Sequence, residues 1–312
     1  MAGHLLHIMH FEMSETPRGA PQGAGSADAE ASPLVAYVLG GGGDLGANEV
    51  GMLRALLERG ILPDLIVGSS IGAINGAAIA AEPSLQMLDR LEAVWRRLGK
   101  ERIFDSPFRI ASTLIRERTH LNTGLPLRRL LDRLLPVRTF EELAVPFQCV
   151  AACIERAAEH WFTEGCLIDA IVASSAVPGL LPVVEIGGEH FMDGGIVNSI
   201  PIEQAIALGA TELYILHAGR VERPLQPPRN LLQVMTVAFE IARRHRFAHD
   251  MAHLPPGIVA HVLPTGEEGP GSSIRTWDFE AVGQRIARAY EATRVYLDGL
   301  ARSPGREGVQ GE

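Results

Sequence analysis

The chain has 312 residues, of which 46 % are hydrophobic and 21 % are charged, so it can bury a large core. A formal charge of −9 and an isoelectric point near 5.7 argue against a general nucleic-acid binder, which needs a concentrated basic face. The three cysteines, Cys149, Cys153 and Cys166, form no metal-type cluster and cannot all pair with one another. We therefore expect buried, inert thiols in a reducing, cytoplasmic setting.

The two ends of the chain differ in composition from its centre. Residues 1–33 lack the basic start and apolar core of a secretory signal, and their later part is rich in small and polar residues. We expect a disordered tail over residues 1–33, one folded domain over residues 34–300 and a second tail over residues 301–312. The uncharged run of residues 65–81 is too short for a membrane-spanning helix, so we interpret it as a strand, a turn and a helix.

The first predicted elements form a βαβ unit. LVAYVLG predicts a buried strand over residues 34–39, and ANEVGMLRALLERG predicts an amphipathic helix that is capped by Gly60. PDLIVG then predicts a second strand, and IGAINGAAIAA a helix of small residues. The two loops, GGGGDLG and GSSIG, both leave the carboxyl ends of parallel strands, where open α/β sheets place their sites. If the strands are neighbours, the loops face each other.

The rest of the chain extends this α/β pattern. Residues 82–145 predict a basic, helical insertion, whose amphipathic pieces are packed surface helices or, with less weight, a cover over the site or a membrane contact. Further on, PFQCVAACI and ELYILHAG predict strands, Gly187 and Gly188 a hairpin turn, and PIEQAIALG a helix. Helices are predicted near residues 231–254 and 277–300, with the strand GIVAHVL between them. We expect an α/β fold, a three-layer sandwich with a mostly parallel central sheet.

The glycine loop leaves backbone amides without carbonyl partners, so it can bind negative charge. Three interpretations compete: a phosphate cradle, an oxyanion hole and a structural turn. A P-loop needs a Gly-Lys-Ser/Thr ending that is missing here, and Asp44 would repel phosphate. Gly41, Gly43 and Gly46 fit the dinucleotide pattern G-x-G-x-x-G, but the next strand lacks an acidic residue at its end.

Ser70 is the central residue of a G-x-S-x-G motif, which predicts either a sharp strand-to-helix turn that exposes a nucleophilic serine or only a structural turn of small residues. A nucleophilic serine needs a base within hydrogen-bond reach. Asp193, in the sequence MDGG, is one candidate, and His217 is another, because Ser70, Asp193 and His217 follow the order of α/β-hydrolase triads.

Three further histidines, His245, His249 and His253, share one helix face at four-residue spacing. That spacing suits a metal, but a solvated histidine stripe is favoured, and we expect no metal site.

Three blocks in order, GGGGDLG, GSSIG and DGG, resemble the glycine-loop, nucleophile and aspartate blocks of the patatin-like phospholipase family. The resemblance extends over residues 34–218 through TGLPLRRLLDRLL, TFEELAVPFQCVA and ASSAVPGLLPVV. It implies a serine esterase that cleaves fatty-acyl esters of lipids, of the phospholipase A or lysophospholipase type, without a cofactor. A lipid ester is then the substrate, and contact with a membrane surface is transient.

The same resemblance implies a dyad without histidine, in which Ser70 is the nucleophile and Asp193 the base. It also implies that the amides of Gly41, Gly42 and Gly43 form the oxyanion hole. One position departs from the family pattern, because Leu45 stands where arginine or lysine is common. Two alternatives stay open: a non-hydrolytic lipid or nucleotide binding module, and an acyltransferase.

Overall fold

The computed structural model describes residues 33–101, 124–217, 224–228, 231–266 and 282–302. Within these residues, eight strands form one sheet. The strands are β1 (Val35–Leu39), β2 (Leu65–Ser69), β3 (Phe147–Cys153), β4 (Ala158–Phe162), β5 (Val184–Ile186), β6 (Glu189–Asp193), β7 (Glu212–Leu216) and β8 (Val259–Val262). The α-helices are α1 (Ala47–Glu58), α2 (Ile71–Ala81), α3 (Leu85–Glu101), α5 (Leu125–Leu134), α6 (Leu167–Ser174), α7 (Ile202–Ala207), α8 (Leu231–Ala252) and α9 (Val282–Arg302). The 3-10 helices are η1 (Gly43–Gly46), η2 (Phe140–Glu142) and η3 (Gly194–Ile196).

The centre of the sheet is parallel. The strand order is β5-β6-β3-β2-β1-β7-β8, and β4 pairs with β3 off this path. Strands β3, β2, β1, β7 and β8 run parallel to one another, whereas β4, β5 and β6 pair antiparallel. Because β1 pairs directly with β2, the two loops that follow them leave the same edge of the sheet side by side, as the sequence predicts.

Strands β2 and β6 meet end to end beside β3. On β2, Ser69 is paired with Val150, and on β6, Asp193 is paired with the next residue, Ala151. Strand β4 takes the opposite edge of β3 over residues 149–153, so β2 and β6 must share one edge. Because β6 runs antiparallel, both strands end at this junction and deliver the residues at their carboxyl ends to one place.

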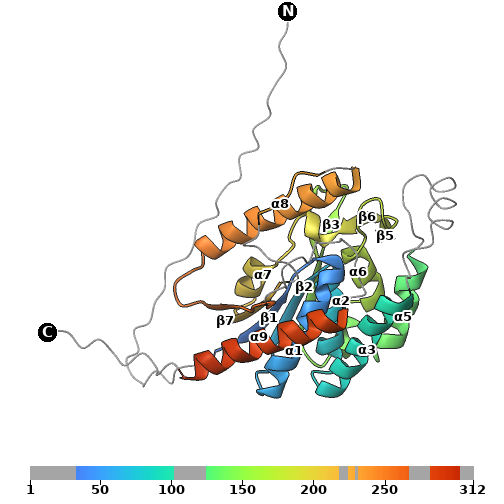
Figure 1. The fold of residues 1–312 in the computed structure, drawn as a ribbon. Helices are drawn as coiled ribbons and strands as arrows, with labels where there is room; N and C mark the ends of the chain where they lie inside the picture. The colour runs from blue at the N-terminus through green and yellow to red at the C-terminus, as the bar shows by residue number, and fades with distance from the viewer. Residues whose placement is uncertain (1–32, 102–123, 218–223, 229–230, 267–281, 303–312) are drawn as a thin grey trace, which may run out of the picture. The chain divides into compact units, whose positions relative to one another are not determined.

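Helices cover both faces of the sheet (Figure 1). Side chains alternate along a strand, so Tyr37 and Leu39 of β1 enter one core while Ala36 and Val38 enter the other. The first core is built with α1, α2, α3, α5, α6 and α9, and the second with α7 and the C-terminal half of α8. This arrangement confirms the predicted three-layer α/β fold with a mostly parallel central sheet.

The sequence missed two elements, β4 and α6. The segment AEHWF of β4 mixes charged and aromatic residues, and none of its first four side chains is fully buried, so the apolar run of a central strand is missing. The tails predicted over residues 1–33 and 301–312 fall almost entirely outside the described residues. Helices α3 and α5 lie in the predicted insertion, whose residues 102–123 are also outside the described part.

Two further expectations concern the burial of the cysteines and the absence of a membrane-spanning helix. Cys149 and Cys153 are buried as expected, but Cys166 is exposed, because it precedes α6 on an outer loop rather than lying in a strand. Among the helices that the structure describes, none combines the length and the apolar character needed to cross a membrane.

Candidate active site

Ser70 lies at a strained turn between β2 and α2. Its backbone has φ 54° and ψ −121°, values that a residue with a side chain rarely adopts. The flanking glycines make the turn possible: a Cβ on Gly68 would lie 2.7 Å from the Gly72 carbonyl oxygen, and one on Gly72 would lie 2.4 Å from the Leu39 carbonyl oxygen. The sequence therefore builds a nucleophile elbow that places the Ser70 hydroxyl at the N-terminus of α2.

The hydroxyl of Ser70 donates a hydrogen bond directly to Asp193. Its Oγ lies 2.6 Å from Asp193 Oδ2, and Asp193 Oδ1 accepts from the Gly195 amide at 2.8 Å. Burial raises the pKa of Asp193 to about 6, although the bonds from Ser70 and Gly195 oppose the rise. A pKa near 6 brings this carboxylate closer to the range of a general base at neutral pH.

Two serines that the sequence analysis did not single out support the elbow. Ser174 Oγ accepts from the Ser70 amide at 2.9 Å, and Ser175 Oγ donates to the Ser70 carbonyl at 3.2 Å. The Asp193 amide donates to the carbonyl of Ala176 at 3.0 Å. The end of α6 thus holds both members of the pair. The only sequence signal was the block ASSAVPG, which carried the resemblance without a role of its own.

The glycine loop lies against Ser70. A Cβ on Gly41 would be 3.4 Å from the Ser70 Cβ. The Gly41 amide donates to the Ser199 carbonyl at 2.8 Å, which differs from its expected place in an oxyanion hole. Among the described residues, no acceptor is bound to the amides of Gly42 and Gly43, and Gly42 is exposed. These two amides are free to meet a ligand.

A buried network holds the far end of the loop. Asn75 Nδ2 donates to the Gly46 carbonyl at 3.1 Å and to Glu49 Oε2 at 2.7 Å, and Trp95 Nε1 donates to Asn75 Oδ1 at 3.0 Å. Burial raises the pKa of Glu49 well above its ordinary value, which favours the neutral form of this carboxyl behind the loop.

The family model of the patatin-like phospholipases matches residues 37–206, more than half of the chain. The chain belongs to the patatin-like phospholipase family. The matched segment contains the glycine loop, the elbow at Ser70 and the Asp193 corner, so the family's segment and the observed site coincide.

Curated relatives of this patatin-like protein include lipid hydrolases. It is 30 % identical over 188 residues to lysophospholipase NTE1 of Mycosarcoma maydis, covering 60 % of this chain and 10 % of that one. It is 31 % identical over 187 residues to patatin-like phospholipase domain-containing protein 7 of Rattus norvegicus, covering 59 % and 14 %. The chain therefore matches only about a tenth of the length of these relatives.

Two solved structures are similar to this chain at low sequence identity. VipD from Legionella pneumophila is 14 % identical with a TM-score of 0.45, covering 86 % of this chain and 67 % of that one. Human GIVD cytosolic phospholipase A2, solved with methyl gamma-linolenyl fluorophosphonate, is 13 % identical with a TM-score of 0.44, covering 85 % and 58 %.

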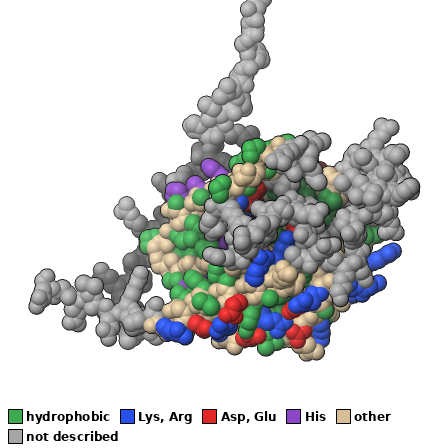
Figure 2. Space-filling model, viewed as in Figure 1, with side chains coloured by type: hydrophobic (Ala, Val, Ile, Leu, Met, Phe, Trp, Pro, Cys, Tyr) green, Lys and Arg blue, Asp and Glu red, His purple; other side chains and the backbone are tan. Residues whose placement is uncertain are grey.

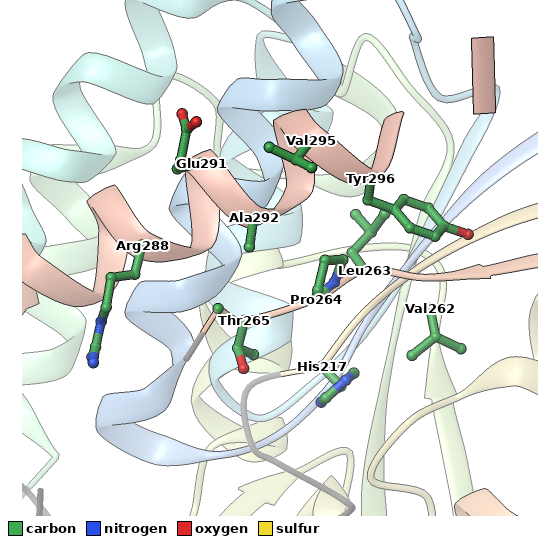
Figure 3. Close-up of a pocket in the computed structure, with 11 residues that line it drawn as sticks. His217, Val262, Leu263, Pro264, Thr265, Arg288, Glu291, Ala292, Val295 and Tyr296 are labelled. Carbon is green, nitrogen blue, oxygen red and sulfur yellow. The ribbon is translucent and has the colours of Figure 1, made fainter. Parts of the chain in front are cut away.

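His217, the alternative base, lines a separate pocket of this patatin-like protein (Figure 3). This pocket of about 800 Å³ is formed mainly by the end of β8 and by α9, and among the described residues that line it neither Ser70 nor Asp193 occurs. The His217 ring centroid lies 6.1 Å from that of Phe247 in α8. The Ser70 proton is already bonded to Asp193, so the observed pair does not depend on a histidine.

The histidine stripe of α8 is exposed at the end of that helix, where histidine side chains gather in Figure 2. Ligand atoms of Glu203, His249 and Asp250 lie within 4.8 Å of one another. Arg246 donates to Glu203 at 2.8 Å and to Asp250 at 3.3 Å, so a guanidinium is already bound to both carboxylates and offsets part of their charge. The chemistry of this cluster does not suit a cation.

Proposed function

We propose that the protein is a serine hydrolase of fatty-acyl esters in lipids, of the phospholipase A or lysophospholipase type. The observation that carries the proposal is the 2.6 Å hydrogen bond from Ser70 Oγ to Asp193 Oδ2 at a strained elbow. Membership of the patatin-like family, and relatives named as lysophospholipases, support a lipid ester as the substrate class.

In the first step, Ser70 Oγ attacks the ester carbonyl carbon while Asp193 Oδ2 takes the hydroxyl proton. The carbonyl oxygen becomes an oxyanion, and we assign its stabilisation to the amides of Gly42 and Gly43 and to the N-terminus of α2. The tetrahedral intermediate then expels the alcohol, which receives the proton from Asp193. An acyl group remains bound to Ser70.

In the second step, water attacks the acyl-enzyme and Asp193 accepts one of its protons. The same amides stabilise the second oxyanion, and collapse releases the fatty acid and returns the proton to Ser70. An exposed aspartate, with a pKa near 3.9, is a poor base for an alcohol. Burial of Asp193 reduces this mismatch, because it raises the pKa of the carboxyl to about 6.

The proposal is tested by labelling the full chain with an alkyl fluorophosphonate and mapping the adduct. We expect an adduct on Ser70 in the wild type, none on that position in Ser70→Ala, and labelling at least about 100-fold slower in Asp193→Asn. Ser69→Ala is the matched control, because Ser69 is the neighbouring buried serine and its hydroxyl has no hydrogen-bond partner among the described residues.

Substrate class is tested with the same variants on vesicles of a diacyl phospholipid, on a lysophospholipid and on a short acyl ester. Release of fatty acid that depends on Ser70 supports the proposal. Retained turnover in folded Ser70→Ala would contradict it, and saturable lipid binding without an adduct in folded wild-type protein would favour the binding module. Transfer of the acyl group to an added acceptor in place of water would favour the acyltransferase.

A further inference from the structure

A buried ion pair connects the C-terminal helix to the glycine loop. Arg285 Nη1 lies 2.6 Å from Asp44 Oδ2 and also donates to the Asp44 carbonyl at 3.4 Å. The two side chains are only 8 % and 5 % exposed. Arg285 lies in the first turn of α9, whereas Asp44 directly follows the two glycines whose amides we assign to the oxyanion hole.

The charge of Asp44 affects the proposed oxyanion hole because Asp44 directly follows Gly42 and Gly43. A buried carboxylate beside Gly42 and Gly43 opposes the negative charge that develops on the oxyanion, and a cation bonded to that carboxylate reduces this effect. The guanidinium of Arg285 offsets the charge of Asp44 and, through the carbonyl bond, also holds the backbone of η1. Leu45, the next residue, has no charged group that would serve instead.

Helix α9 is itself fixed against α1. A Cβ on Gly51 of α1 would lie 2.2 Å from the Ile286 carbonyl oxygen and 2.7 Å from the Tyr290 nitrogen, so the two helices touch backbone to backbone. This contact begins one residue after Arg285. The guanidinium therefore extends from a helix that has little freedom to shift relative to the loop.

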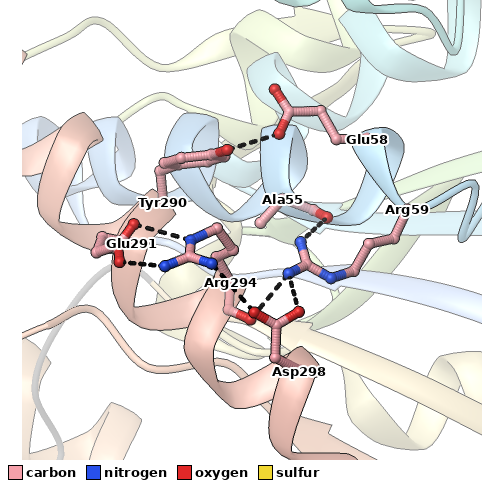
Figure 4. Close-up of polar contacts among 7 residues, drawn as sticks. All are labelled: Ala55, Glu58, Arg59, Tyr290, Glu291, Arg294 and Asp298. Atoms are coloured by element: carbon pink, nitrogen blue, oxygen red, sulfur yellow. Dashed lines mark hydrogen bonds and ion pairs between the residues drawn. The ribbon is translucent and has the colours of Figure 1, made fainter. Parts of the chain in front are cut away.

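The other end of α9 is held by surface charges (Figure 4). Arg59, the residue that follows α1, donates to Asp298 at 2.5 Å and to the Arg294 carbonyl at 3.0 Å. These groups are a quarter to two-fifths exposed and lie three turns along the helix from Arg285. They attach the same two helices without contacting the glycine loop.

We propose that Arg285 is a positioning residue for the oxyanion hole, which makes α9 part of the catalytic machinery. The helix lies outside residues 37–206, the segment that matches the family model. This inference rests on the proposed serine hydrolase function and adds to it a contribution from a distant part of the chain. The alternative is an ion pair that only stabilises the fold.

The two roles are separated by variants of the full chain. Arg285→Met removes the positive charge, Arg285→Lys keeps it, and the double variant Asp44→Asn/Arg285→Met removes both charges of the pair. Arg59→Met is the matched control, since it weakens the attachment of α9 at the far end. The measurements are the maximal rate and half-saturating concentration for labelling by a soluble alkyl fluorophosphonate, kcat and KM for a soluble acyl ester, and thermal unfolding.

We expect Arg285→Met to lower kcat and the maximal labelling rate by about 10- to 100-fold, with KM changed less than about threefold. Arg285→Lys should restore most of this loss. The double variant should unfold near the wild-type temperature but stay about 10-fold slow, because the loop has lost its tether. Arg59→Met should keep the wild-type rates within about twofold, whatever its effect on unfolding.

Wild-type kcat in folded Arg285→Met, or in the double variant, would overturn the positioning role while leaving the proposed function intact. Equal losses of rate in Arg59→Met and Arg285→Met would do the same, since the effect would then come from docking of α9 alone. Failure of the proposed function has a different signature, namely turnover that survives Ser70→Ala.

Discussion

The corner where β2 and β6 meet and the face between α1 and α9 are held together by different kinds of residue. At the corner, small residues and strained backbone bring Ser70 and Asp193 into contact: Ser70 has a positive φ, and Gly194 touches the neighbouring strand. On the helix face, long charged side chains such as Arg59 and Arg285 connect segments more than 230 residues apart.

This difference explains which functional residues can be predicted from the sequence alone. A corner that tolerates only small residues at fixed spacing leaves a motif, because any larger side chain collides with backbone. An ion pair between two helices has no sequence motif, because arginine is common on exposed helix faces and packing decides which acidic residue it meets. The four predictions that follow test this contrast, from the largest expected effect to the smallest.

The largest effect is expected from Gly194→Ala at the corner. A Cβ on Gly194 would lie 2.2 Å from the Val150 carbonyl oxygen, which belongs to the backbone of β3 and cannot move freely. We expect a loss of about 3 kcal/mol in the free energy of unfolding, together with loss of Ser70 labelling. Urea unfolding and labelling measure the two effects. Gly188→Ala in the nearby hairpin turn is the control: its Cβ meets open space, although its φ of +85° adds a strain of about 1 kcal/mol.

The second prediction concerns the charge of Asp193. Its folded pKa is raised from 3.8 to about 6, so folding favours the protonated form. The resulting loss of stability, about 3 kcal/mol, is fully present above pH 6 and is relieved as the pH falls from 6 to 3.8. Asp193→Asn should therefore be more stable than the wild type at pH 8, and the difference should vanish near pH 4.

The catalytic rate has the opposite dependence on pH, because Asp193 must be ionised to act as the base. Labelling of wild-type Ser70 should fall as the pH drops through about 6. Urea unfolding of both proteins at pH 8 and pH 4 tests the stability prediction, and wild-type labelling rates measured across the same pH range test the catalytic one. An Asp193→Asn variant that is less stable than the wild type at pH 8 would show that the carboxylate is not under strain at this corner.

The third prediction compares a glycine on the face between α1 and α9 with an exposed glycine of α9. Gly51→Ala should lower the free energy of unfolding by about 2 kcal/mol, because the new methyl group would push α9 away from α1. Among the described residues, nothing lies within 4 Å of a Cβ on Gly299 of α9, so Gly299→Ala should stabilise by about 0.5–1 kcal/mol through helix propensity. Thermal unfolding separates them. Equal effects would mean that α1 and α9 do not pack closely in solution.

The smallest effect is expected from His217→Ala, which alters the pocket of Figure 3 and leaves the corner intact. We expect kcat/KM to fall by less than about fivefold, because Asp193 accepts the Ser70 proton directly. A loss of a thousandfold, comparable with that in Ser70→Ala, would favour a triad that includes His217.

The sequence predicted most strands and helices of this protein, because their apolar patterns are local. It missed β4, whose first four side chains are not fully buried, and α6, of which only Ala173 and Ser174 lie in a block that carries the resemblance. Ser174 and Ser175 were missed for the same reason: their role depends on where α6 ends relative to Ser70.

The sequence by itself determined the parallel βαβ start, the two loops on one sheet edge and the two residues, Ser70 and Asp193, that the motifs single out. It did so because tight turns admit few residue types. Only the tertiary structure decided that β2 and β6 end against neighbouring residues of β3, that the Gly41 amide is bound to Ser199, and that Arg285 pairs with Asp44. Those contacts join distant segments through packing, and spacing along the chain carries no record of them.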